Sequence, residues 1–436
     1  MLTVSRKMDL LRFEFIQAAE EGKDVEKYRE KLALLDESKT GHRELDELYG
    51  EILSSPTVAG WPYVEPDSLE EIRRRANPPK DEEAWISRHE LRDRMLGAWF
   101  GRIVGNMLGK PVEGWPKNRI EEYLKKAGCY PLDYYIPELI PHVEKSLQEY
   151  YRVGGLRGSL SKALRDDDLD YTVLGLLLLE RKGFSFTTDD VAEEWLNRLP
   201  FHLTYTAERE AYRNLTLGLK PPETATFWNP FREWIGAQIR ADPWGYANPM
   251  RPWSAAEMAY RDARLSHVKN GIYGEMLMAA MVASAFSEPE PLKIVEKGLS
   301  CIPLESRLAE AVRRCVDLWR KHKDFDAAYG EAMLKYGCYH PVHVINNAAI
   351  VVLALLYGEG DFGKSVCLSV SSGLDTDCNG ATVGSIVGAM IGFKRIPEKW
   401  YSPLNNTLDS ALSGLGELKI SELAERMVKV VAENWS

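Results

Sequence analysis

Glycine recurs at every fourth position in two distant segments of this 436-residue chain, and this repeat limits the fold more than any other feature. The first segment carries Gly97, Gly101, Gly105 and Gly109; the second, within residues 371–392, carries Gly380, Gly384 and Gly388. Residues four apart lie on one face of an α-helix. Each glycine costs about 1 kcal/mol relative to alanine inside a helix, so the pattern indicates that another backbone approaches closely. We therefore expect the two segments to form helices that pack against each other.

The other segments also show helical periodicity, and we predict an all-α fold. Two charged amphipathic helices are expected within residues 1–58, and a proline-rich linker at 58–83 contains a short helix at 68–76. Further helices are predicted at 191–199, 207–217, 231–239, 255–267, 273–286 and 342–357. On this basis we divide the chain into a helical N-terminal extension with its linker, residues 1–88, and a compact main domain, residues 89–436.

Composition narrows the classes of function. The net charge is -10 and there is no basic block, which disfavours binding to nucleic acid through phosphate neutralisation. The N-terminus lacks an apolar signal region, and no long uncharged apolar run follows, so we expect neither export nor a membrane span. The six cysteines include no CxxC pair, which argues against a disulfide framework or a thiolate zinc site. We expect a cytoplasmic protein.

Aspartates cluster at two predicted junctions between a loop and a helix. Asp166, Asp167 and Asp168 precede a strongly apolar helix, and Asp375 and Asp377 precede the second glycine-rich helix. One aspartate satisfies the positive end of a helix, whereas three repel one another unless a cation neutralises them. Hard oxygen ligands select magnesium, manganese or calcium over zinc or copper. The two clusters therefore predict one metal site between helix ends, with room for two ions.

Residues 240–253 combine tryptophan, tyrosine, glycine, asparagine and proline. We interpret this segment as a rigid loop whose rings form the wall of a binding cleft, suited to a planar or sugar ligand. His267, at the end of the following helix, is by default a structural histidine. Glu113 follows the first glycine-rich helix and, taken alone, is most simply a solvent-exposed acid.

Together these motifs resemble the ADP-ribosylglycohydrolase family, of the dinitrogenase-reductase-activating type. The resemblance rests on Gly-Asn-Met-Leu-Gly-Lys-Pro-Val-Glu at 105–113, Asp-Asp-Asp-Leu-Asp at 166–170, Tyr-Ala-Asn-Pro-Met-Arg-Pro at 246–252 and Gly-Leu-Asp-Thr-Asp-Cys at 373–378. They occur in the family's order across residues 91–395. Each motif alone is a weak signal, but the joint match is specific.

The resemblance implies a helical fold with a central cleft, two Mg²⁺ ions (with Mn²⁺ as an alternative), and hydrolysis of a glycosidic bond in an ADP-ribosyl unit. By position it assigns Glu113 to the acidic residue that approaches the metals and the scissile ribose, and we expect Glu113 or Asp168 to act as the catalytic base. It assigns metal binding to Asp166, Asp167, Asp168, Asp375, Asp377 and Cys378, and substrate contacts to Asn106, Trp244, Gly245, Tyr246, Asn248, Arg251 and His267. Three positions depart from the family's pattern, which commonly has Asp at Asn106 and Thr at Asp166 and Cys378.

Two alternatives stay open at this point. The aromatic segment suggests a hydrolase of the same fold that acts on another pentoside or nucleoside-like glycoside. Asn106 and Cys378 suggest a non-catalytic, metal-dependent binder of ADP-ribose.

Overall fold

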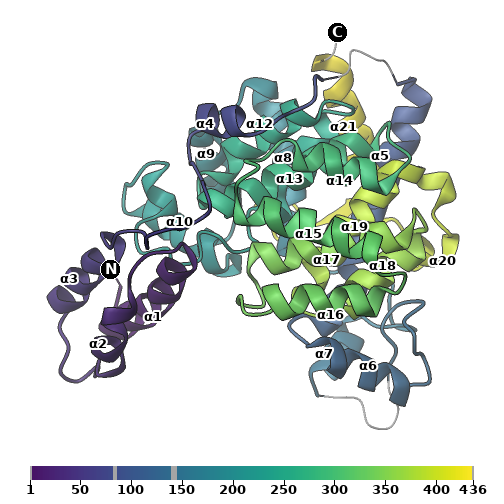
Figure 1. Cartoon of the computed structure of the whole chain (residues 1–436). Helices are drawn as coiled ribbons and strands as arrows, with labels where there is room; N and C mark the ends of the chain where they lie inside the picture. Colours follow the sequence, from purple (N-terminus) through teal and green to yellow (C-terminus); the bar gives the residue numbers. More distant parts are fainter. Residues whose placement is uncertain (1, 82–85, 139–144, 435–436) are drawn as a thin grey trace.

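The computed structural model describes residues 2–81, 86–138 and 145–434, and it confirms the prediction of an all-α fold. In the described residues, the regular β structure is one short antiparallel pair, β1 (Thr407–Asp409) and β2 (Glu417–Lys419). The last two residues of the predicted 58–83 linker lie outside the described residues. Helices α1 to α3 form a lobe beside the main body, which packs around α13 and α19 (Figure 1).

The bounds of the helices are as follows. The N-terminal part contains α1 (Val4–Glu20), α2 (Arg29–Ala33), α3 (His42–Leu53) and α4 (Leu69–Arg75). The main body contains α5 (Arg88–Gly109), α6 (Lys117–Lys126), α7 (Lys145–Val153), α8 (Asp167–Lys182), α9 (Thr188–Arg198), α10 (Thr206–Thr216), α11 (Asp242–Ala247), α12 (Pro252–Ala263), α13 (Lys269–Ala285), α14 (Pro291–Leu299), α15 (Arg307–Lys321), α16 (Phe325–Tyr336), α17 (Val344–Gly358), α18 (Phe362–Ser371), α19 (Thr376–Ile391), α20 (Glu398–Tyr401) and α21 (Ile420–Asn434).

The two glycine-rich helices, α5 and α19, pack against each other as the sequence predicts. A Cβ atom added at Gly97, Gly101 or Gly105 would overlap with the carbonyl oxygen of Gly388, Gly384 or Gly380, respectively. The descending order of these partners shows that the helices are antiparallel. The end of α5 therefore lies beside the start of α19, where Gly109 abuts the backbone of Thr376. This contact fixes the two helix ends that hold the predicted acidic residues.

The interior is built from helices that are buried on nearly all sides. All residues of α17 are buried, as are all of α13 except its first. A helix that is apolar around its whole circumference belongs in the centre of a large protein. These two helices pack against α19. The acidic start of α19 is thus supported by the buried interior of the fold.

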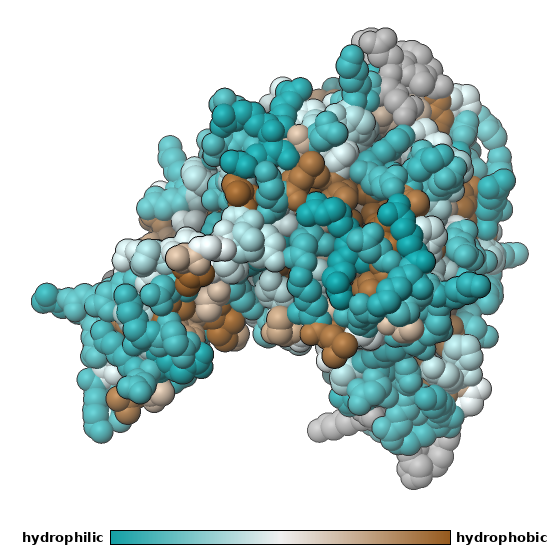
Figure 2. Space-filling view, in the orientation of Figure 1, coloured by the Kyte–Doolittle hydropathy of each residue, from teal (hydrophilic) through white to brown (hydrophobic). Residues whose placement is uncertain are grey.

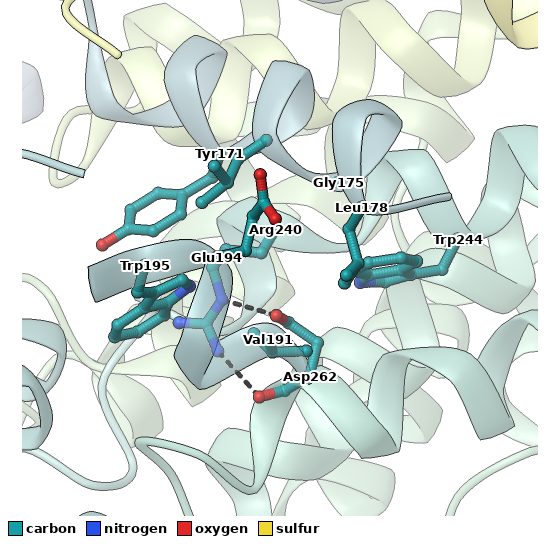
Figure 3. A pocket seen from close by; sticks show the side chains of 10 residues that line it. Tyr171, Gly175, Leu178, Val191, Glu194, Trp195, Arg240, Trp244 and Asp262 are labelled. Carbon is teal, nitrogen blue, oxygen red and sulfur yellow. Dashed lines mark hydrogen bonds and ion pairs between the residues drawn. The ribbon is translucent and has the colours of Figure 1, made fainter. Parts of the chain in front are cut away.

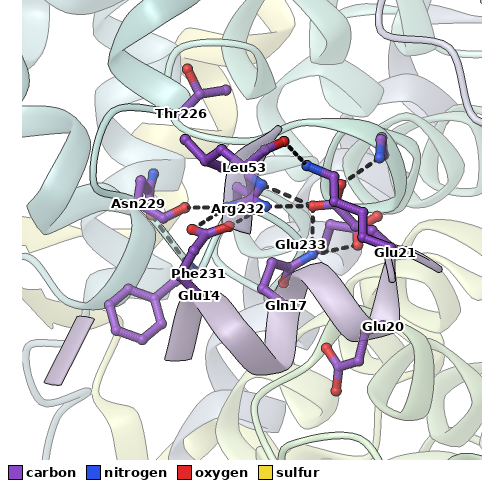
Figure 4. Close-up of polar contacts among 12 residues, drawn as sticks. Glu14, Gln17, Glu20, Glu21, Leu53, Thr226, Asn229, Phe231, Arg232 and Glu233 are labelled. Atoms are coloured by element: carbon purple, nitrogen blue, oxygen red, sulfur yellow. Dashed lines mark hydrogen bonds and ion pairs between the residues drawn. The ribbon is translucent and has the colours of Figure 1, made fainter. Parts of the chain in front are cut away.

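The N-terminal lobe docks on the main body through a buried network of charges (Figure 4). The guanidinium of Arg232 donates to both carboxylate oxygens of Glu14 at 2.8 Å and pairs with Glu21 at 2.7 Å. Arg307 joins the linker to the body, because it pairs with both Glu65 and Glu233 at 2.7 Å. Apolar residues of α1 and α3 cover Trp228, Phe231 and Trp234 alongside these pairs. The extension therefore packs onto the main body through a second hydrophobic cluster rather than lying free.

Replacing Arg232 by methionine is expected to lower the free energy of unfolding by about 3 kcal/mol or more, because it leaves the buried carboxylate of Glu14 without its ion-pair partner, while Glu21 keeps Lys269. Urea unfolding followed by circular dichroism measures this loss. Arg43→Met is the matched control: Arg43 pairs with Glu47 on the exposed face of α3, and such pairs contribute less than about 1 kcal/mol. Equal effects of the two substitutions would contradict the structural role of the network.

Two predictions of local structure are wrong. Residues 231–239 do not form a helix; they are turns, followed by a short 3-10 helix, η6 (Gln238–Arg240). The reason is pairing with a distant segment: the Ile235 N–H donates to Val342, and the Val344 N–H donates to Glu233. The second error concerns the segment predicted as a loop at 240–253, of which residues 242–247 form α11. Pro243 stands in the first turn of α11, where its missing N–H costs no hydrogen bond.

Hydrophilic residues predominate on the face shown in Figure 2, and hydrophobic ones occur there in small separate groups. No helix in the described part of the chain combines the length and the apolarity that crossing a bilayer requires.

Candidate active site

Three chain segments bring acidic residues together at one place. Asp166 caps α8, its side chain accepting the backbone N–H of Asp168 at 3.1 Å. Asp375 caps α19 and follows two residues with positive φ, Gly373 and Leu374, which turn the chain sharply into the helix. The Thr376 hydroxyl donates to the carbonyl of Gly109 at 2.8 Å and joins the start of α19 to the end of α5.

Glu113 reaches this place through pairing of two loops. The Gly114 N–H donates to the carbonyl of Leu374 at 2.9 Å, and the Leu374 N–H donates back to Trp115 at 3.3 Å. An isolated bridge between Pro116 and Gly373 extends the pairing. Glu113 directly precedes the first paired loop, and Asp375 directly follows the second. The pairing therefore holds Glu113 next to Asp375 and Asp377. Glu113 is exposed, as expected of a lone glutamate, but it lies at the rim of the acidic cluster.

The acidic side chains form three overlapping groups. Within each group, one ligand atom per residue lies within 4.8 Å of the others; the groups are Asp166, Asp167 and Asp168; Asp168, Asp377 and Cys378; and Glu113, Asp375 and Asp377. Asp168 and Asp377 each belong to two groups, so the three form one continuous site. Every residue predicted to bind metal, and both predicted catalytic residues, are therefore brought together.

Crowding and burial raise the pKa of most of these carboxyl groups. The negative charge of Asp377, followed by burial, raises the pKa of Glu113 to about 9, and burial followed by the charge of Asp166 raises the pKa of Asp377 to about 6. Burial also raises the pKa of Asp168 and of Asp375 well above the ordinary value. Like charges at such distances disfavour ionisation of all of them together. A cation in their midst would remove this penalty.

The structure offers open ligand atoms for such a cation. Asp375 and Asp377 are 6% and 4% exposed, and the Oδ1 atom of each is buried without a hydrogen-bond partner. A buried carboxylate oxygen with no partner is costly, so it implies a group that completes the site. The donors are hard oxygens, as magnesium and manganese prefer. Cys378 contributes a neutral thiol rather than a thiolate, because burial raises its pKa and its Sγ donates to Asp168 at 3.3 Å.

Sequence comparison now identifies the family. The model of the family described as ADP-ribosylglycohydrolase matches residues 87–436. The chain belongs to the ADP-ribosylglycohydrolase family. A solved structure described as "ADP-ribosylglycohydrolase-related protein complex" shares the fold with a TM-score of 0.54 at 22% sequence identity, over 79% of this chain and 99% of that one. No curated protein sequence matches the chain.

Sequence reasoning missed three residues that support the ADP-ribosylglycohydrolase site. Arg102 of α5, fully buried, donates to the carbonyl of Asp168 at 3.0 Å and pairs with Asp242 at 2.6 Å. Asn347 of α17 accepts the Asp375 N–H at 3.3 Å and the amide of Asn379 at 2.7 Å. Lys110 forms an ion pair with Asp166. The available signal for Arg102 was an arginine in the largely apolar second half of a glycine-rich helix, whereas Asn347 and Lys110 carry no such local signal.

The residues predicted to contact substrate fall into two sets. Asn106 is buried beside Asp166, where its amide helps to lower the pKa of that carboxyl. Trp244, Gly245, Tyr246, Asn248 and His267 are buried elsewhere in the interior, and Arg251 immediately precedes α12. His267, the one possible metal ligand among these six, belongs to none of the three acidic groups found among the described residues.

The buried positions explain why the aromatic segment does not form the wall that we expected. Trp244 donates its indole N–H to Glu275 at 2.7 Å and stacks on Phe186, and it lines a cavity of about 10 Å³, room for a single water (Figure 3). A Cβ atom at Gly245 would overlap with Val282 of α13, so this glycine permits close packing rather than a turn. Tyr246 connects to the site indirectly, since it lies against Asp242, the partner of Arg102.

The raised carboxyl pKa values predict that magnesium stabilises the protein more at high pH than at low pH. Carboxyl groups in the unfolded chain titrate near about pH 4, and the folded pKa of Asp377 is about 6. Protonated Asp377 therefore contributes about 3 kcal/mol to the free energy of unfolding of the metal-free protein. This contribution is fully present below about pH 4 and is lost as the pH rises through about 6.

Excess Mg²⁺ should restore this loss. We expect the Tm of the metal-free protein to gain clearly more from Mg²⁺ at about pH 8 than at about pH 5, where protons compete for the same oxygens. Differential scanning fluorimetry with EDTA or with Mg²⁺ measures both shifts. An equal gain at the two pH values would contradict the assignment of the cation to these carboxylates.

Proposed function

We propose that this protein is a magnesium- or manganese-dependent hydrolase that cleaves an N- or O-glycosidic bond at the anomeric carbon of an ADP-ribosyl unit, carried by a small molecule or by a protein. Family membership supports the class of reaction. The observation that carries the proposal is the convergence of Asp168, Asp375 and Asp377 beside Glu113, with buried carboxylate oxygens left open for a cation. Structural acids with satisfied hydrogen bonds would not leave such oxygens open.

Asp375, Asp377 and Asp168 are the residues that would hold the cation, with Glu113 at its edge. A bound divalent ion supplies positive charge that orients vicinal hydroxyls and a water molecule. Cleavage at an anomeric carbon develops positive charge on the sugar, which neighbouring carboxylates stabilise. The cluster thus suits a ribose whose ring lies over the start of α19.

Glu113 is the residue best placed to take the proton from the attacking water. It is exposed at the rim, whereas Asp168 is 1% exposed and its carboxylate is contacted by Arg102 at 3.5 Å and by Cys378 at 3.3 Å. With a neutralised Asp377 beside it, the largest cause of the raised Glu113 pKa is removed, which lowers that pKa and favours the anion that acts as general base. Asp168 then serves to position the cation and the water.

A substrate panel tests the proposal. The purified protein is incubated with ADP-ribosyl-arginine, ADP-ribosyl-serine and simple pentosides, with Mg²⁺ or with EDTA, and free ADP-ribose or pentose is quantified. We expect ADP-ribose release that requires the divalent ion. Release of pentose alone would replace ADP-ribose by another glycoside, and tight binding of ADP-ribose without turnover would establish a non-catalytic binder.

Glu113→Gln is expected to lower the rate of ADP-ribose release by a factor of about 100 to 10,000, because general-base catalysis contributes on that scale. The matched control is Glu122→Gln on the exposed face of α6, which should keep the original rate. A Glu113→Gln variant with undiminished turnover would remove Glu113 from the mechanism. The metal affinity of the variant, measured in parallel, separates loss of the base from loss of the cation.

A further inference from the structure

We propose that the ammonium group of Lys110 permanently occupies one of the two cation positions in this site, so that the protein binds a single divalent ion. The inference rests on the proposed cation-dependent function and revises the expectation of two ions. Some carboxylate oxygens of the cluster already have partners within the chain, and others have none; the inference is drawn from this difference.

Both carboxylate oxygens of Asp166 are already engaged. Its Oδ1 atom accepts the backbone N–H of Asp168 at 3.1 Å, and its Oδ2 atom accepts the ammonium of Lys110. Asp166 is 2% exposed, so its oxygens have no solvent to exchange these partners for. A magnesium ion needs a ligand oxygen at about 2.1 Å with a free lone pair directed at it. The charge of Asp166 is therefore already neutralised by Lys110, whereas Asp375 and Asp377 keep open oxygens for a metal.

The position of Lys110 is fixed by a close backbone contact between α5 and α19. The preceding residue, Gly109, abuts the backbone of Thr376 and receives the Thr376 hydroxyl on its carbonyl. The Lys110 N–H continues the helical pattern by donating to Asn106. The side chain of Lys110 is 16% exposed, so most of its length is covered. From this anchor the ammonium extends into the acidic cluster between the starts of α8 and α19.

The open oxygens lie on the other side of the cluster. Oδ1 of Asp375 and Oδ1 of Asp377 are the buried carboxylate oxygens without partners among the site's described residues, and both belong to the group that includes Glu113. They define one position for a cation, next to the loop that carries the proposed base. A second divalent ion on the Asp166 side would have to push the Lys110 ammonium away from Asp166. The ammonium would still lie close to the ion, and like charges repel strongly in a buried site.

This arrangement gives the site a built-in monovalent cation that does not dissociate. A lysine ammonium offers three hydrogen-bond donors but no ligand position, so it can neutralise Asp166 and donate to an anionic or hydroxyl group without activating a water. Orienting the attacking water would then fall to the divalent ion beside Glu113 and not to the ammonium.

Counting bound metal tests the inference without any assay of activity. Metal-free protein is titrated with Mn²⁺ by calorimetry, and the bound ion is examined by electron paramagnetic resonance, which distinguishes an isolated Mn²⁺ from a coupled pair. We expect a single equivalent and an isolated-ion spectrum for the unaltered protein. Lys110→Ser, which frees both the charge and the space, should take up a second equivalent and show coupling, whereas Lys110→Arg should still bind one.

Two equivalents in the unaltered protein, or no gain in Lys110→Ser with native circular dichroism, would overturn the inference. Asp166→Asn guards against a Lys110 variant that fails to fold: it should still bind a single equivalent, with an affinity lowered by no more than about 10- to 100-fold, since the open ligands are elsewhere. Loss of the only equivalent in Asp166→Asn would also overturn it. Failure of the proposed function would look different, as bound metal without release of ADP-ribose.

Discussion

Replacing Asp377 by asparagine is expected to weaken binding of Mg²⁺ or Mn²⁺ by more than about 100-fold and to reduce hydrolysis to a comparable extent. Asp377 belongs to two of the three acidic groups, with Asp168 on one side and with Glu113 and Asp375 on the other. Its Oδ1 atom is buried and unpaired, so the carboxylate is available as a ligand. Asparagine keeps the shape of the side chain but removes its charge.

Calorimetric titration with Mn²⁺ and the ADP-ribose release assay measure the two effects on the same preparation. The control is Asp317→Asn, an aspartate on α15 whose side chain is 75% exposed and which should leave both quantities unchanged. Because the metal-free Asp377 has a raised pKa, Asp377→Asn should also make the metal-free protein more stable at about pH 8. Unaltered metal affinity in Asp377→Asn would remove the carboxylate site from the account.

Replacing Gly105 by alanine is expected to destabilise the fold by more than about 4 kcal/mol, or to prevent folding. The added methyl group would overlap with the carbonyl oxygen and carbon of Gly380, which are backbone atoms of a buried helix and cannot rotate away. Helices α5 and α19 would have to separate, and the cluster carried on their ends would open with them.

Gly330→Ala is the matched control for this prediction. Gly330 also lies inside a helix, α16, but nothing stands within 4 Å of a Cβ atom at that position. Alanine there should raise stability by up to about 1 kcal/mol because it favours the helical backbone. Urea unfolding of both variants gives the comparison. If Gly105→Ala were as stable as the original protein, the backbone contact between the two helices would not be present.

The glycine repeats and the aspartate clusters carried the most structural information in the sequence. Glycine at every fourth position predicts both the helices and their contact. Glycine destabilises a helix, and a face without side chains offsets this loss only when another backbone packs against it. Once the helix ends are paired, Gly109 meets Thr376 and the acids at 166–168 and 375–377 have one place to meet. Repulsion among buried like charges then predicts a cation without knowledge of the fold.

Other features could not be predicted because they depend on tertiary contacts. Residues 231–239 have a helical pattern, but pairing with residues 342–344 prevents the helix. The ring-rich segment 240–253 has the composition of a cleft wall, yet hydrophobic rings also suit a core, and Trp244 and Tyr246 are buried there. Lys110 follows a glycine-rich helix and precedes a proline. Nothing in the local sequence indicates that its ammonium pairs with Asp166, 56 residues away.

The most direct test of the central claim is the location of a bound cation in crystals containing Mn²⁺, found by its anomalous scattering. We predict a peak at coordinating distance from Asp375 and Asp377, close to Asp168 and Glu113, at the junction between the starts of α8 and α19. A metal-dependent enzyme whose crystals show no peak at this junction, or show it bound by other residues, would contradict the account.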